Sequence, residues 1–67
     1  MFKVDSEFVR RMMFERGLSL KQFAKAAGLN GLTVAKIVKD GATASAQTIA
    51  TLARFFGVDG NSLIRKS

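Results

Sequence analysis

The chain has only 67 residues and contains neither cysteine nor histidine, so side-chain packing must hold its fold together. Disulfide bridges and the common zinc sites, which stabilise many domains of this size, depend on those two residue types. Hydrophobic residues make up 48% of the sequence and supply the material for a core. We therefore expect one domain over residues 1–67, with no metal and no cofactor.

The apolar residues recur at helical spacing along the chain, and proline is absent. Ile49, Leu52 and Phe56, for example, are spaced to share one face of a helix. No segment shows the sustained alternation of a strand, so we expect no strands. The spacing predicts an all-α fold of five helices, over residues 5–16, 20–27, 31–39, 45–56 and 60–65.

The segment of residues 20–39 meets the physical demands of a helix-turn-helix motif. Its sequence is LKQFAKAAGLNGLTVAKIVK. Two helices that cross steeply through a short turn need a small residue where they approach, and Ala24 is small. Gly28 suits a turn residue with a positive φ. The positions that should face inward are all apolar: Phe23, Ala27, Leu29, Val34 and Ile37.

The basic residues are concentrated in the middle of the chain. The formal net charge is +6, and no acidic residue occurs between Arg16 and Lys39. A strongly basic small domain favours a polyanionic partner, which is usually nucleic acid. The alternative is a basic surface that serves only solubility.

Nearly the whole chain resembles the lambda-repressor-like (XRE, or Cro and phage-repressor) helix-turn-helix domains. The stretch GLSLKQFAKAAGL is similar to the family's first core segment, and ASAQTIATLARFFGV is similar to its fourth helix. Leu63 and Ile64 match its closing apolar pair, and the resemblance runs without a gap from Gly17 to Ile64. It implies a compact bundle of four or five helices that binds operator DNA as a dimer.

By this resemblance, the helix after Asn30 is the recognition helix that enters the major groove. The candidate residues for reading bases are Asn30, Gly31, Leu32, Thr33 and Lys36. Asparagine can pair with adenine and lysine with guanine, whereas Gly31 has no side chain and Leu32 offers only apolar atoms. The candidate residues for binding phosphate are Ser19, Leu20, Lys21 and Lys39.

The sequence departs from the family at the predicted interface. Leu20 stands where the family commonly has glutamine, and Gly31 and Leu32 stand where it usually has long or polar residues. Simpler roles also exist for the other candidates. Asn30 suits a helix N-cap, and Lys36 suits the end of a helix by its charge alone.

Large apolar residues near the end of the chain suggest a dimer face. Phe55 directly precedes the core position Phe56 in the same predicted helix, so the two rings point to different sides and we expect that of Phe55 to be partly exposed. Phe55 and Ile64 are the candidates for this face, and scattered apolar surface residues are the alternative.

The function that these patterns favour is a sequence-specific, double-stranded-DNA-binding transcriptional regulator, an operator-binding repressor acting as a homodimer. The alternative is a protein-interaction module, such as an antitoxin or adaptor, that keeps the helix-turn-helix fold. We expect no enzyme activity and no small-molecule substrate. The chain has no histidine or cysteine, and the acids Asp5, Glu7 and Glu15 share one short helix and do not form a pair in a cleft. A chain of this size also lacks room for a pocket that holds a drug-sized molecule.

The sequence also bears on location. The stretch without charge from Gly41 to Ala53 is shorter than the roughly 20 apolar residues of a membrane span. The first residues contain acids where a signal peptide would be apolar. We expect a soluble, cytoplasmic protein without membrane contacts and without a separate effector domain.

Overall fold

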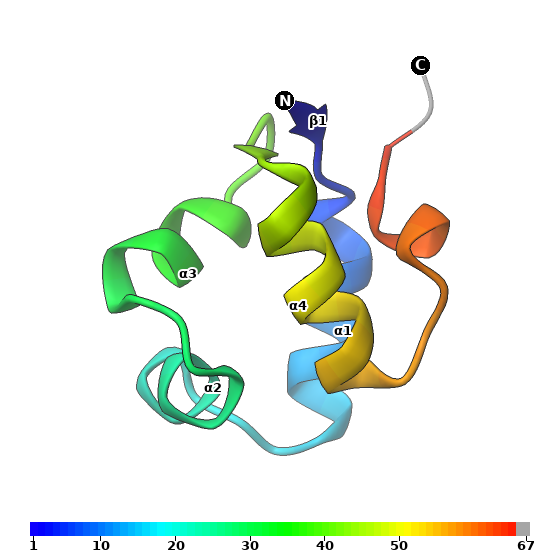
Figure 1. The fold of residues 1–67 in the computed structure, drawn as a ribbon. Helices are drawn as coiled ribbons and strands as arrows, with labels where there is room; N and C mark the ends of the chain where they lie inside the picture. Colours follow the sequence, from blue (N-terminus) through cyan, green and yellow to red (C-terminus); the bar gives the residue numbers. More distant parts are fainter. Residues whose placement is uncertain (66–67) are drawn as a thin grey trace.

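The structure, a computed structural model, describes residues 1–65 and consists there of four α-helices, one short 3-10 helix and two short strands. The elements in chain order are β1 (Phe2–Lys3), α1 (Ser6–Glu15), α2 (Leu20–Ala27), α3 (Gly31–Ile37), β2 (Thr43–Ala44), α4 (Ala46–Phe56) and the 3-10 helix η1 (Gly60–Leu63). Figure 1 shows α4 between α3 on one side and η1 on the other, with α1 behind it. No helix in residues 1–65 is both long and apolar enough to cross a membrane.

Each α-helix begins at a side-chain cap that the sequence supplies. The capping oxygen accepts a hydrogen bond from a backbone N–H of the first turn, which would otherwise lack a partner. The caps are Asp5, Ser19, Asn30 and Ser45. The predicted bounds of the second helix are confirmed; the first helix is one residue shorter than predicted at each end, and the fourth begins one residue later than predicted.

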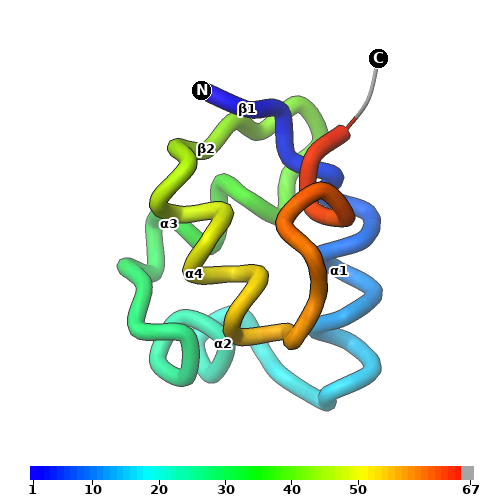
Figure 2. Tube along the Cα trace, turned by 45° about the vertical axis from the view of Figure 1, so that its right-hand side comes forward, coloured from blue at the N-terminus to red at the C-terminus, as the bar shows by residue number. Residues whose placement is uncertain are grey.

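The prediction that the chain contains no strands is wrong. β1 and β2 pair antiparallel, with Phe2 opposite Ala44 and Lys3 opposite Thr43. Figure 2 shows the N-terminal segment running beside β2 and close to the last described residues, where the backbone N–H of Arg65 donates to the Lys3 carbonyl at 2.8 Å. Strands of two residues are too short to show an alternating pattern in sequence, and their pairing joins distant parts of the chain.

The predicted fifth helix is not an α-helix. Residues Gly60–Leu63 form a 3-10 helix that Asp59 caps, and Ile64 then becomes extended and bridges Val4. The segment therefore has the predicted start, but it ends early because Ile64 pairs with the N-terminal segment. The described part of the chain is mostly helical, with four α-helices and not five.

One apolar face of every helix contributes to a shared core. The side chains with no exposed surface come from α1, α2, α3, α4 and η1: Val9, Phe23, Val34, Leu52 and Leu63. The ring of Phe23 lies 5.6 Å from that of Phe55 and 5.3 Å from that of Phe56, measured between centroids. Phe23 thus joins α2 to α4 by aromatic contacts.

The C-terminal end of α3 is held by two side chains of α1. Ser6 is 4% exposed, and its hydroxyl lies 2.7 Å from each of the carbonyl oxygens of Ile37 and Lys39. Arg10 donates to the Val38 carbonyl and lies 3.2 Å from the carboxylate of Asp40. Helix ends leave carbonyls without partners, and α1 supplies those partners here. These contacts accompany the end of α3 at Ile37, two residues before the predicted end.

We predict that Ser6→Ala lowers the free energy of unfolding by about 1–3 kcal/mol, because it removes the hydroxyl donor of the buried Ile37 carbonyl, whereas the Lys39 carbonyl keeps the N–H of Ala42. Urea unfolding followed by circular dichroism measures this. The matched control is Ser62→Ala, at an exposed position of η1, which we expect to change stability by less than about 0.5 kcal/mol. Equal unfolding midpoints for the two variants would contradict the prediction.

Candidate nucleic-acid interface

The turn between α2 and α3 depends on the conformation of Gly28. Its φ is +71°, in the left-handed region, and an added Cβ would meet no atom within 4 Å. The backbone angle, and not lack of space, therefore calls for glycine. The Ala24 carbonyl accepts the N–H of Leu29 at 2.9 Å, which closes the turn as α3 approaches. The predicted helix-turn-helix geometry of residues 20–39 is thus present.

The side chains of α3 divide into an inward and an outward face. Val34 and Ile37 are buried, whereas Leu32 is 73% exposed and Lys36 is exposed. Thr33 lies on the flank and is half-buried; it lines a hollow beside the first turn of α4, which Lys36 also lines. The outward face at the start of α3 therefore carries Leu32, and Lys36 follows it one turn later.

Asn30 serves as the N-cap of α3. Its Oδ1 atom accepts the backbone N–H of Leu32 at 2.8 Å. A bidentate pair with adenine uses this oxygen as well as the side-chain amide nitrogen, and the oxygen then has to accept a second N–H with its remaining lone pair. The simpler role as a cap is confirmed, and the amide N–H groups are the part of Asn30 best placed to meet a partner.

The start of α2 is closed by a capping box. The Ser19 hydroxyl accepts the N–H of Gln22 at 3.2 Å, and the Gln22 side chain accepts the N–H of Ser19 at 2.9 Å. The side chain of Ser19 is therefore committed to the helix itself. The backbone N–H groups of Leu20 and Lys21 come next, and within an α-helix the first-turn N–H groups have no intrahelical acceptor. Leu20 is 42% exposed, so this end of α2 faces outward.

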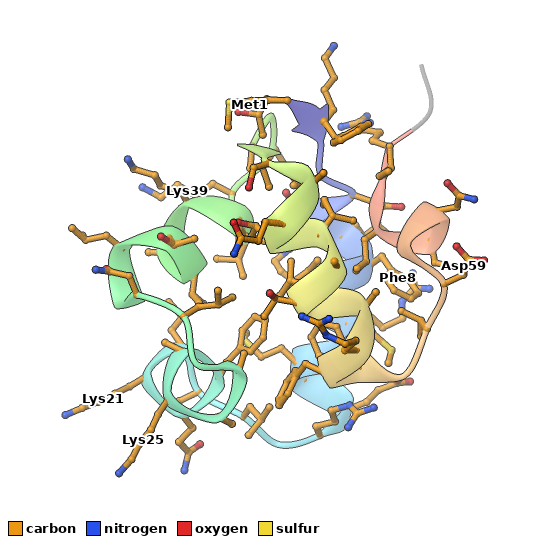
Figure 3. All side chains as sticks on the ribbon, viewed as in Figure 1. Met1, Phe8, Lys21, Lys25, Lys39 and Asp59 are labelled. Atoms are coloured by element: carbon orange, nitrogen blue, oxygen red, sulfur yellow. The ribbon has the colours of Figure 1, made fainter. Side chains whose placement is uncertain are left out.

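The surface around α2 and α3 is basic. Lys21, Lys25, Lys36 and Lys39 are all exposed. In Figure 3 the side chains of Lys21, Lys25 and Lys39 extend outward from the side formed by α2 and α3, whereas Asp59 lies on the opposite side of the molecule. The nearest acid in sequence, Asp40, is drawn into an ion pair with Arg10. The tertiary structure therefore keeps the charge separation that the sequence contains.

The two dimer-face candidates lie in different surroundings. Ile64 lines a mostly apolar groove of about 430 Å³ between α4, η1 and β1. The other residues that line the groove are Phe2, Ala46, Ile49, Ala50, Ala53, Arg54, Asp59, Gly60 and Asn61. Phe55 is half-buried instead; it stacks on Phe23, and the Arg16 guanidinium lies 5.9 Å from its ring centroid. Phe55 is thus partly exposed as predicted, but it covers the core and does not line the groove.

A family model described as helix-turn-helix matches residues 9–63. The chain belongs to this family. The resemblance to lambda-repressor-like domains that the sequence indicated is thereby confirmed. The matched segment runs from within α1 to the end of η1 and includes both helices of the motif. No curated protein and no solved structure matches the chain.

Three residues that support this helix-turn-helix domain were missed in the sequence. Gln22 follows Ser19 by three positions, which is the spacing of a capping box, so the sequence did contain a signal for it. Ser6 and Arg10 had no such signal. Their partners lie about one half of the chain away, at Ile37, Val38 and Lys39.

We predict that Asn30→Asp separates the cap from any role of Asn30 in binding DNA. Aspartate caps helices as well as asparagine does, so the unfolding midpoint should stay nearly unchanged. The variant replaces two N–H donors by negative charge on the basic face, so affinity for duplex DNA should fall about ten-fold or more. Thermal unfolding and fluorescence anisotropy measure the two effects. Unchanged affinity for duplex DNA, with an unchanged unfolding midpoint, would show that Asn30 acts only as a cap.

Proposed function

We propose that this helix-turn-helix protein is a sequence-specific regulator of transcription that binds duplex operator DNA in the cytoplasm, as a homodimeric repressor. The observation that carries the proposal is the exposed outer face of α3, which no other described element covers and which basic side chains surround. Membership in a family of DNA-binding domains supports the same partner.

In this proposal α3 enters the major groove, which admits one α-helix. Lys36 then faces the base edges and can donate to guanine. Lys21 and the first N–H groups of α2 meet a phosphate on one side, and Lys39, just beyond α3, meets another. Thr33 is half-buried on the flank of α3, so we assign it to the edge of the major groove. The protein acts by occupying DNA and has no catalytic step.

We propose that the groove between α4, η1 and β1 forms the dimer contact. Its floor is apolar, and its lining includes one cation, Arg54, and one anion, Asp59. In a two-fold symmetric interface Arg54 of each copy can face Asp59 of the other copy, so these two residues can form two ion pairs between the copies. α4 lies between α3 and η1 (Figure 1), and the groove is lined by α4 together with η1 and β1, which leaves the basic face free. Two recognition helices can then enter major grooves roughly 34 Å apart.

A protein-interaction module remains the second candidate, and one observation favours it. Leu20 and Leu32 are both exposed on the α2 and α3 side, where a DNA-binding face is expected to be polar. Exposed apolar residues that belong together commonly mark a protein contact. Removing the charges of Lys36 and Lys39 discriminates between the candidates, because DNA binding depends on these charges far more than an apolar contact does.

We predict that binding to a random-sequence duplex weakens steeply with salt, and that Lys21→Gln lowers the slope of log affinity against log salt concentration by about 1. The slope falls because one phosphate contact, and the counterion that it releases, are lost. Fluorescence anisotropy at several salt concentrations gives the slope.

The matched control is Arg11→Gln, which removes one positive charge from α1, where Arg11 pairs with Glu7 at an exposed position. It should leave the slope nearly unchanged. If the wild-type protein binds no duplex even at low salt, DNA binding is excluded as the function.

We predict that Ala50→Glu shifts the protein from dimer to monomer in analytical ultracentrifugation, because it places a charge on the apolar floor of the groove. Gln47→Glu is the control, since it adds the same charge at an exposed position of α4 outside the groove. Identical sedimentation of both variants, or a monomeric wild-type protein in the presence of DNA, would rule out this dimer contact.

A further inference from the structure

Leu32 is the most prominent side chain of the exposed face of α3. It is 73% exposed, and within the helix it lies about 200° from the buried Val34 and about 40° from Lys36. A leucine kept in water forgoes the stabilisation that burial would give, and nothing in the described core depends on it. The fold therefore does not account for a leucine at this position.

None of the residues next to Leu32 places a second large side chain on the outer face at the start of α3. Gly31 has no side chain, although an added Cβ there would meet no atom within 4 Å. Packing thus does not require glycine at position 31. Because Gly31 has no side chain, its backbone and the side chain of Leu32 can come close to a partner. Asn30 has its side-chain oxygen bound to the N–H of Leu32, and Thr33 is half-buried on the flank.

The major groove contains one apolar group that such a side chain can meet, the C5-methyl group of thymine. We propose that Leu32 determines sequence specificity by packing against a thymine methyl group. Lys36 lies about 6 Å further along the helix, roughly the rise of two base pairs, on nearly the same face. The site then contains a thymine close to a guanine, one read by an apolar contact and the other by a hydrogen bond. This inference rests on the proposed DNA-binding function.

The test uses the full chain and a duplex selected from a random DNA pool. Each thymine of that duplex is replaced in turn by deoxyuridine, which lacks only the methyl group. The wild-type protein should lose about four-fold in affinity at the contacted thymine, the change that corresponds to one buried methyl group at about 0.8 kcal/mol. Other thymines should have little effect.

Two variants assign the effect to Leu32. Leu32→Ala should bind more weakly and lose its sensitivity to deoxyuridine at the contacted position. Leu20→Ala removes the other exposed leucine of the two helices and should keep that sensitivity. The Leu32→Ala variant should also be used to select sequences from the random pool, an experiment that works with weak binding. The selected sequences should no longer show a preference for thymine at the contacted position.

The outcomes separate this inference from the proposed function. Salt-dependent DNA binding with no effect of deoxyuridine at any thymine would overturn the role of Leu32 and leave the function intact. A Leu32→Ala variant that stays as sensitive as the wild-type protein would overturn it as well. If no DNA is bound at low salt, both fail, and Leu32 becomes part of a contact with a protein.

Discussion

The position of α3 depends on the hydroxyl of Ser6, which is buried between α1 and the end of α3. This hydroxyl faces the carbonyls of Ile37 and Lys39, and Arg10 of the same helix binds Val38 and Asp40. α3 has seven residues, which is too short for a helix that is stable by itself. Its N-terminal end is closed by Asn30 and its C-terminal end by α1, so the surrounding structure maintains this helix.

The division of α3 into two faces lets so short a helix serve both folding and the proposed recognition of DNA. Val34 and Ile37 anchor it in the core, and they leave Leu32 and Lys36 on the outer surface. The first turn has few polar groups to offer, because Gly31 has no side chain and the oxygen of Asn30 is engaged. The proposed DNA interface of this composition relies on shape and apolar contact as well as on charge, whereas a row of polar side chains would rely on hydrogen bonds.

Backbone pairing of the N-terminal segment stabilises this small domain without covalent links. The N-terminal segment lies between β2 and the residues around Ile64, and hydrogen bonds connect it to both. Both ends of the described chain are therefore tied to the same place, which limits fraying in a domain with few residues to bury. The same arrangement holds η1 next to α4 and so shapes the apolar groove.

The sequence by itself determined the presence of the four α-helices, their caps, the turn at Gly28 and the basic middle of the chain, because each depends on neighbouring residues or on composition, but it wrongly predicted a fifth α-helix. It also led to the inward residues Phe23, Val34 and Ile37, since helical spacing decides which side chains share a face. The tertiary structure decided the two short strands, the early end of α3 at Ile37 and the separate settings of Phe55 and Ile64. These features arise from hydrogen bonds and packing between residues far apart in the chain, and no local pattern encodes such partners.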